Sequence, residues 1–201
     1  MKKILILLFL TSLASGCAFT RSETPINYSP SLPPDMNFIG EPSVTLEVGK
    51  IIDERLLADP TIVFHKRNLY GTKTTGYYAA QKPVCDIFRK GLIDALKKAN
   101  FNIVDANGHY VLQGELKEFD SDVHMGWITG TIIPKMIVKF ELLDGESGKQ
   151  IWKEVIFGKG TIEVSAETSD KKIIKQCFSL VMDDVVSELI GDPTFQDAFQ
   201  P

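Results

Sequence analysis

The sequence predicts an α/β fold of the α+β type, a two-layer sandwich in which two helices pack on a mostly antiparallel sheet. Three observations support this prediction. Two segments carry apolar residues at helical spacing along a single stripe. Several other segments alternate apolar and polar residues, which indicates strands with one buried face. The strands after the first helix follow one another over short turns, so we expect them to pair as antiparallel neighbours.

The N-terminus is typical of a processed export signal. Two lysines precede an unbroken apolar run, and small residues then lead into Cys17. The apolar stretch is shorter than the roughly 20 residues that a membrane-spanning helix needs. Small residues directly before a cysteine resemble the bacterial lipobox, here Ala14-Ser15-Gly16-Cys17. This resemblance implies that residues 1–16 are removed and that Cys17 is lipidated. The alternative is an ordinary secretory signal with a cysteine nearby.

The residue after the cysteine bears on the membrane to which the chain is attached. In lipoproteins that resemble this one, an aspartate at that position favours retention at the inner membrane. Residue 18 is alanine, which implies a lipid anchor in the outer membrane, at its periplasmic face. The acyl chains on Cys17 would supply the attachment, since each buried methylene contributes about 0.8 kcal/mol and stable anchoring needs two or more chains.

The composition of the remaining chain excludes some classes of partner. Loss of residues 1–16 removes Lys2 and Lys3 and moves the formal net charge from −4 to about −6. An acidic chain lacks the basic footprint that nucleic acids need, and it gains little from an anionic membrane surface. The length of the chain supports one domain with a substantial core.

Residues 17–42 have the composition of a tether, and a single α/β periplasmic domain is expected over 43–201. Five of the ten prolines lie between residues 25 and 42, and no hydrophobic period is visible among them. As a coil this segment would reach about 25–30 Å, and as polyproline II about 75–80 Å. The alternative, which can hold together with a tether, is that Met36–Ile39 docks on the domain as an additional edge segment.

The first part of the domain contains one predicted strand and one predicted helix. Alternating apolar residues from Val44 onward predict a strand that ends at Asp53-Glu54-Arg55. Residues 56–80 show no clear period and indicate a long loop or a short irregular hairpin. Pro83 suits the first position of a helix that ends at Asn100. Its apolar stripe consists of Val84, Phe88, Gly91, Leu92, Ala95 and Ala99.

The second part contains several strands and a second helix. We expect strands over residues 101–104, 110–116, 136–142 and 151–157, the last two joined by a turn at 144–149. Asp170 is a suitable N-cap for the helix, and Gly191 closes it. Its apolar stripe consists of Ile174, Cys177, Phe178, Val181, Val185 and Leu189.

These features together resemble the YajG-like outer-membrane lipoproteins of Gram-negative bacteria. The points of likeness are the lipobox at Cys17, the first strand leading into Asp53-x-Arg55, Ala-Asn-Phe at 99–101, the hairpin sequence DGESGKQIW at 144–152, and Asp192-Pro-Thr-Phe195 with Ala198-Phe199. The resemblance covers nearly all of the mature chain, through short motifs. It implies an envelope lipoprotein with an α/β domain and no established catalytic activity, and therefore a fold and a location rather than a mechanism.

No residues form a recognisable catalytic or metal-binding constellation. Asp53 and Arg55 lie two apart at a strand end, which predicts an ion pair that fixes the following loop rather than a catalytic pair. The histidines, His65, His109 and His124, are not spaced from other ligands as in a metal clamp. The chain has no Gly-x-Ser-x-Gly motif, phosphate-binding loop or Gly-x-Gly-x-x-Gly motif. We therefore expect a protein that is not an enzyme and that needs no metal or cofactor.

Two cysteines remain once lipidation takes Cys17. Cys85 and Cys177 lie one on each predicted helix, in an oxidising compartment, so a disulfide is one interpretation. Closing a loop of about 92 residues would stabilise the fold by roughly 4–5 kcal/mol in the chain-entropy model. The alternative is that both are small buried hydrophobic residues, as free cysteines commonly are.

The segment 123–136 is the most distinctive surface candidate. It holds Trp127, Ile128, Ile132 and Ile133 among glycines and a proline that interrupt regular pairing. One interpretation is a bent strand whose apolar residues enter the core. The other is an exposed apolar loop that contacts a partner protein or a membrane. Tyr77 and Tyr78 would line the same surface, because tyrosine is a good interface anchor.

The sequence therefore predicts an outer-membrane lipoprotein that acts by binding. Our first hypothesis is an accessory subunit of a cell-envelope assembly, such as secretion, pilus, flagellar or adhesion machinery, with a protein partner in the envelope. The second is a periplasmic carrier of a lipid or another small apolar ligand. A carrier needs an apolar cavity between sheet and helices, whereas a subunit needs an exposed patch.

Overall fold

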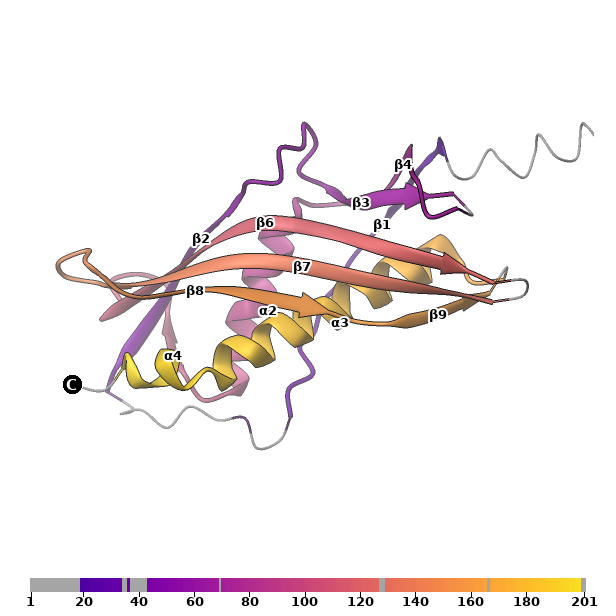
Figure 1. The fold of residues 1–201 in the computed structure, drawn as a ribbon. Coiled ribbons are helices and arrows are strands. Elements are labelled where there is room, and N and C mark those ends of the chain that lie inside the picture. The colour runs from indigo at the N-terminus through magenta and orange to yellow at the C-terminus, as the bar shows by residue number, and fades with distance from the viewer. Residues whose placement is uncertain are drawn as a thin grey trace, which may run out of the picture.

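A computed structural model describes residues 19–33, 36, 43–68, 70–126, 129–165 and 167–199. The main sheet is mixed and mostly antiparallel, and helices pack on it to form an α+β sandwich, as the sequence predicts (Figure 1). Its order is β5 (Asn102–Val104), β2 (Thr45–Asp53), β6 (Tyr110–Met125), β7 (Thr129–Asp144) and β8 (Gln150–Lys159), and β9 (Ile162–Ser165) pairs with the beginning of β7. The pairs β5–β2 and β2–β6 are parallel, and those from β6 to β9 are antiparallel.

The long strands β6 and β7 form one hairpin that runs almost the length of the molecule. The segment 129–136, with its glycine and proline, is continuous strand rather than a loop. Pairing holds from Met125↔Gly130 to Tyr110↔Asp144, with one irregularity between Leu116 and Glu118. Interpreting this segment as a bent strand therefore fits the described residues better than interpreting it as an exposed loop.

A second, smaller sheet lies beside the main one. It consists of β1 (Arg21–Thr24), β4 (Lys73–Ala80) and β3 (Ile62–Arg67), in that order. β3 and β4 form the irregular hairpin that was one of the two predictions for residues 56–80, and β1 pairs with β4 in parallel. Part of the segment that we predicted to be a tether thus supplies a strand of the domain.

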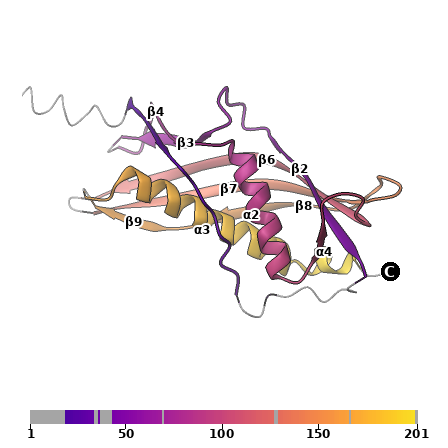
Figure 2. The same cartoon turned by 180° about the vertical axis from the view of Figure 1, so that it is seen from behind.

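Two helices cover one face of the main sheet, as Figure 2 shows from behind. α2 (Val84–Lys98) packs against β2, and α3 (Asp170–Gly191) packs against β7 and β8. The short α4 (Pro193–Asp197) follows α3. All twelve residues of the two predicted stripes are buried. Burying such stripes against a sheet supplies most of the hydrophobic stabilisation of a fold of this kind.

The helix starts differ from the predictions by one residue. Ser169, not Asp170, caps α3, because the Ser169 side chain accepts a hydrogen bond from the backbone N–H of Lys172. Asp170 is instead the first helical residue, where its negative charge favours the helix dipole. Pro83 is the residue before α2 rather than its first residue. From the sequence alone, a helix start at either of two neighbouring residues satisfies the capping rules equally well.

The N-terminal segment is docked on the domain over residues 21–28, which corrects the prediction of a tether for this part of residues 17–42. After β1 the chain runs across α2 and α3 (Figure 2). Ile26 is 8% exposed and Tyr28 is 9% exposed, and the Tyr28 hydroxyl donates a hydrogen bond to Asp183 Oδ1 at 2.6 Å. Prolines do not prevent this docking, because an extended segment can bury side chains without internal hydrogen bonds. Most of the segment Met36–Ile39 lies outside the described residues.

Candidate functional site

The face of the main sheet opposite the helices is open. Along β7 every second residue is buried under α3 or α2, and the residues between them are half-buried on the other face. In Figure 1 this open face is turned to the viewer, and no helix crosses it. A sheet with one covered face presents a broad, rigid surface whose side chains are positioned by the strands. The open face is therefore the first place to look for binding.

A row of alternating charges crosses the open face from the end of β2 to β8. Lys117 Nζ lies 2.6 Å from both Glu54 and Glu115, and Lys139 Nζ lies 3.1 Å from Glu115 and 2.9 Å from Glu141. Lys153 extends the row at 3.8 Å from Glu141. The hydrogen bonds from Lys117 and then from Lys139 lower the pKa of Glu115 below its usual value. The row is close to neutral and held by its own ion pairs.

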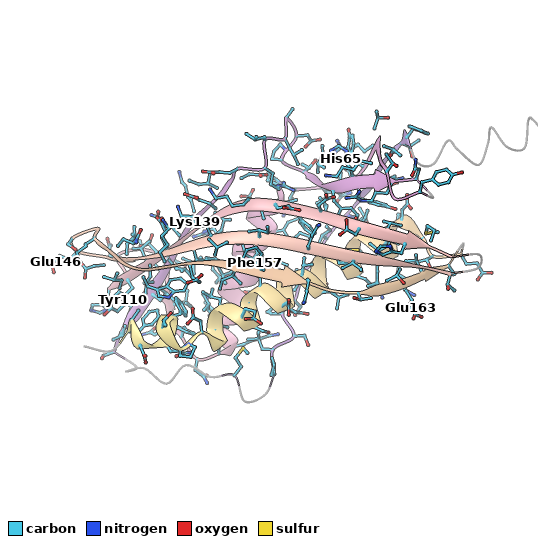
Figure 3. The ribbon with its side chains drawn as sticks, in the orientation of Figure 1. His65, Tyr110, Lys139, Glu146, Phe157 and Glu163 are labelled. Atoms are coloured by element: carbon cyan, nitrogen blue, oxygen red, sulfur yellow. The ribbon has the colours of Figure 1, made fainter. Side chains whose placement is uncertain are left out.

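An apolar patch lies beside this row on β8, the last strand to pair with the middle of β7. Figure 3 labels Phe157 on β8 and Lys139 on β7. Phe157 is 64% exposed, Ile151 40% and Val155 38%. Phe157 pairs with Ile137 and Val155 with Lys139, so the patch borders the charged row directly. We call Ile151, Val155 and Phe157 the β8 patch; an exposed apolar cluster rimmed by charge is typical of a protein-binding surface.

Two surface concavities flank the open face and the β8 edge. One of about 400 Å³ lies over β2 and β6 and is lined by Glu47, Gly49, Ile52 and Gln113, among others. Another of about 820 Å³ lies between β8 and the end of α3 and is lined by Phe157, Lys159, Ser187 and Glu188, among others. Both have mixed polar and apolar linings at the surface of the molecule. Such shapes suit contact with a partner better than enclosure of an apolar ligand.

Asp53 and Arg55 form the predicted ion pair, and they fix the following loop. Arg55 Nη2 lies 2.6 Å from Asp53 Oδ2 and also donates to the carbonyl of Pro60, and Arg55 Nη1 donates to the carbonyl of Ile62. The Arg55 side chain is 3% exposed. Burial alone would raise the pKa of Asp53, but the hydrogen bonds and charge of Arg55 outweigh it and hold this pKa below its usual value. The pair therefore ties the end of β2 to the loop that follows it.

The histidines do not come together. His109 Nδ1 lies 2.7 Å from Thr45 Oγ1, His65 stacks edge-on with Tyr77, and His124 is exposed at the end of β6. Within the described ranges, no group of three or more His, Cys, Asp or Glu side chains could hold a metal ion.

The residues predicted to form a partner surface are separated in the structure. Trp127 and Ile128 lie outside the described residues. Ile132 is 5% exposed and faces the core, so it does not belong to an exposed surface, whereas Ile133 is half-buried on the open face. Tyr78 packs edge-on against Phe64 with ring centroids 5.1 Å apart, and Tyr77 lies under Arg21.

Cys85 and Cys177 are free thiols in the structure, and both are buried. This agrees with the second interpretation, in which they are small buried hydrophobic residues and not a disulfide. Burial in an apolar environment is the main cause that raises the pKa of each thiol to about 12. Neutral thiols of this kind act as small hydrophobic residues and react slowly. Cys17 lies outside the described residues.

Sequence reasoning predicted the strand over residues 151–157 but did not establish which of its faces is buried, so it missed the β8 patch. The alternation of Ile151, Lys153, Val155 and Phe157 resembles a core-facing set, yet Trp152, Ile156 and Gly158 face the helices. A shift of one residue exchanges the two faces of a strand completely. The lysine within the apolar set was the available signal that this face is solvated.

Comparisons with known proteins establish the fold. No family model and no curated protein matches the chain. A DUF330 protein from Xanthomonas campestris is similar at 17% identity, with a TM-score of 0.55, over 88% of this chain and 96% of that one. A minor lipoprotein from Acinetobacter baumannii is similar at 13% identity, with a TM-score of 0.43, over 75% of this chain and 91% of that one.

At such low identity, the likeness to the Xanthomonas protein concerns the fold alone. A search of the helices in the described part of the chain finds none that is both long and apolar enough to cross a membrane.

Proposed function

We propose that this chain is a lipid-anchored lipoprotein of the outer membrane that acts as a non-catalytic binding subunit of a cell-envelope assembly. Its binding surface is the open face of the main sheet, centred on the β8 patch and the adjoining charged row. The observation that carries the proposal is the β8 patch, in which Phe157 is 64% exposed on a regular, well-paired strand. A large aromatic side chain held in water by a rigid strand loses little conformational entropy when a partner covers it.

The charged row contributes specificity to the same surface. Its ion pairs are exposed and contribute little to stability. A partner whose charges follow the opposite order would replace these pairs with ion pairs across the interface. Such an exchange determines how the partner is aligned along the strands more than it raises the affinity.

The alternative function, a carrier of an apolar ligand, has less support. A carrier needs an empty apolar space between sheet and helices. At that place large side chains fill the described core, and Leu112, Met136, Phe140 and Phe178 each have 0% exposure. We therefore favour recognition at the surface over enclosure.

The anchor is tested by replacing its cysteine. In Cys17→Ala the chain should remain an unlipidated precursor and should be absent from the detergent phase after phase separation. Mass spectrometry of the unsubstituted protein should find the acyl groups on residue 17. Lipid labelling that persists in Cys17→Ala would contradict this part of the proposal.

The binding surface is tested by photo-cross-linking in the native envelope. A photoreactive phenylalanine analogue at position 157 should give a discrete adduct, and the same analogue at Lys175, on the solvent side of α3, should not. Val155→Lys should abolish the adduct from position 157. Leu180→Lys is the matched control, because Leu180 is 37% exposed and Val155 is 38% exposed, but Leu180 lies on α3.

The outcomes separate the two hypotheses. An adduct that survives Val155→Lys, or adducts from position 175 alone, would contradict binding at the β8 patch. A lipid or small apolar molecule that remains bound to the purified protein in native mass spectrometry would favour the carrier instead.

A further inference from the structure

The distance between the lipidation site and the folded domain is short. β1 begins at Arg21, only four residues after Cys17. Four residues of fully extended chain span at most about 14 Å. If Cys17 carries the acyl chains, as proposed above, then the end of the domain at β1 lies at the membrane surface. The 25-residue tether that the sequence suggested would have allowed any orientation.

β1 is firmly held at this position. The ammonium of Lys66, a side chain with 4% exposure, lies 2.7 Å from Ser22 Oγ and 2.8 Å from Asp170 Oδ2. Arg21 pairs with Glu23 at 2.8 Å and with Asp59 at 2.6 Å, and Thr24 is completely buried. These contacts join β1 to β3 and to the start of α3. Peeling β1 off would remove the hydrogen bond between Lys66 and Ser22, and the loss of a polar partner is costly for a buried charge.

Two hairpin ends lie beside the start of β1 at the same end of the molecule (Figure 1). The β3–β4 hairpin approaches the end of β6, since Arg67 donates to the carbonyl of Ser121 and a Cβ built on Gly71 would lie 3.3 Å from the carbonyl oxygen of Val123. Apolar side chains project from each of the three: Phe19 is 59% exposed, Tyr70 93% and Met125 43%. We call this end, defined by Phe19, Tyr70 and Met125, the anchor end.

Asp120 and Asp122, two carboxylates of β6 near the anchor end, are paired with basic side chains. Asp120 lies 3.0 Å from Arg67 and 2.7 Å from Lys73, and Asp122 lies 3.2 Å from Lys135. Neutralised carboxylates repel an anionic lipid surface less than free ones. Tyrosine and other amphipathic or apolar side chains are favoured at the boundary between headgroups and water.

We infer that the anchor end faces the bilayer that holds the acyl chains, with Tyr70, Met125 and Phe19 in the interfacial region. The turn between β7 and β8, which carries Glu146 at the opposite end of the sheet, points away from the membrane (Figure 3). The open face is then oriented roughly perpendicular to the membrane plane, and it stays accessible to a partner. The inference rests on the anchor at Cys17, and it specifies an orientation that the anchor alone does not.

The experiment measures how close each end lies to lipid. A fluorescent amino acid is placed at position 70, 125 or 146 of the full mature chain, which is bound to phospholipid vesicles through Cys17. Part of the lipid carries a nitroxide quencher near the headgroup. We expect a loss of emission at positions 70 and 125 and none at position 146. Equal quenching at positions 70 and 146, or stronger quenching at 146, would overturn the inference.

The design distinguishes this inference from the proposed anchor. Should mass spectrometry find Cys17 unmodified in the cell, the proposed anchor fails, and the orientation is still measured after coupling Cys17 to a maleimide lipid. That coupling is selective, because Cys85 and Cys177 are buried and their environment raises the pKa of both thiols to about 12. Soluble quencher provides the reverse control, since it should reach position 146 more readily than position 70.

Discussion

Arg55 illustrates how one buried side chain can organise a segment that has no regular structure. Its guanidinium joins the end of β2, through Asp53, to carbonyls of residues 60, 62 and 63. A planar group with five donors can satisfy more acceptors at once than the three donors of a lysine could. The loop between β2 and β3 is therefore ordered by a cation rather than by an apolar core.

Asp53→Asn should lower the free energy of unfolding by about 2 kcal/mol, because a charged hydrogen-bond acceptor of a buried guanidinium is lost. Urea denaturation at neutral pH measures the effect. The matched control is Glu54→Gln, whose exposed pair with Lys117 should contribute less than about 1 kcal/mol. Equal effects of the two substitutions would contradict the role given to Asp53.

The same pair predicts a pH dependence of stability. Arg55 holds the pKa of Asp53 below its ordinary value of 3.8 in the folded protein, so the contribution is fully present above that value. It is lost as the pH falls below 3.8 through the folded-state pKa. The difference in unfolding free energy between the unsubstituted protein and Asp53→Asn should therefore shrink on acidification. A difference that stays constant down to about pH 2 would contradict this account.

At the scale of elements, the contact between α2 and the N-terminal segment depends on one glycine. Gly91 lies on the buried face of α2, and a Cβ built there would come 2.2 Å from Cδ1 of Tyr28. The Tyr28 ring therefore occupies the space that a side chain would need. The sequence placed Gly91 in the apolar stripe of the helix, but nothing local to the helix could reveal which residue covers it.

Gly91→Ala should displace Tyr28 and loosen the N-terminal segment. In an ordinary helix interior the substitution stabilises by about 1 kcal/mol, so a loss of stability here would be diagnostic of the contact. Hydrogen exchange should accelerate over residues 21–33. Lys97→Ala, on the exposed side of the same helix, should leave that exchange unchanged. Unchanged exchange in Gly91→Ala would show that the segment is not held by this contact.

At the scale of the whole molecule, the N-terminal segment belongs to the cooperative unit. Both β1 and the run past Tyr28 contact the main body through strand pairing, ion pairs and buried side chains. Long-range contacts of this kind join the small sheet, α2 and α3. The domain thus begins near residue 20 rather than at residue 43.

A chain that starts at Ser43 should be less stable than the mature chain by about 3–6 kcal/mol, since it loses the burial of Ile26 and Tyr28. Thermal and urea unfolding of the two chains measure the difference. As a control, Pro25→Ala keeps the segment and should change stability by less than about 1 kcal/mol. Equal stability of the long and short chains would restore the interpretation of residues 17–42 as a free tether.

The sequence by itself determined the local features of this protein. The stripes of α2 and α3, most of the strands and the Asp53–Arg55 pair follow from periodicity and from residues close in the chain. The lipobox resemblance at Cys17 also depends on adjacent residues alone. Each of these is a short-range pattern, in which the physical cause and its sequence signature lie within a few positions.

Only the tertiary structure decided which surfaces remain free and where the folded domain begins. β1 pairs with β4 across more than fifty residues, and Tyr28 bonds to Asp183 across 155. β8 turns Trp152 inward and Phe157 outward because its register with β7 is set by the whole hairpin. Contacts of this range leave no periodic trace in the sequence, since each partner alone is compatible with many arrangements. The open face and the anchor end therefore emerge only when distant segments meet.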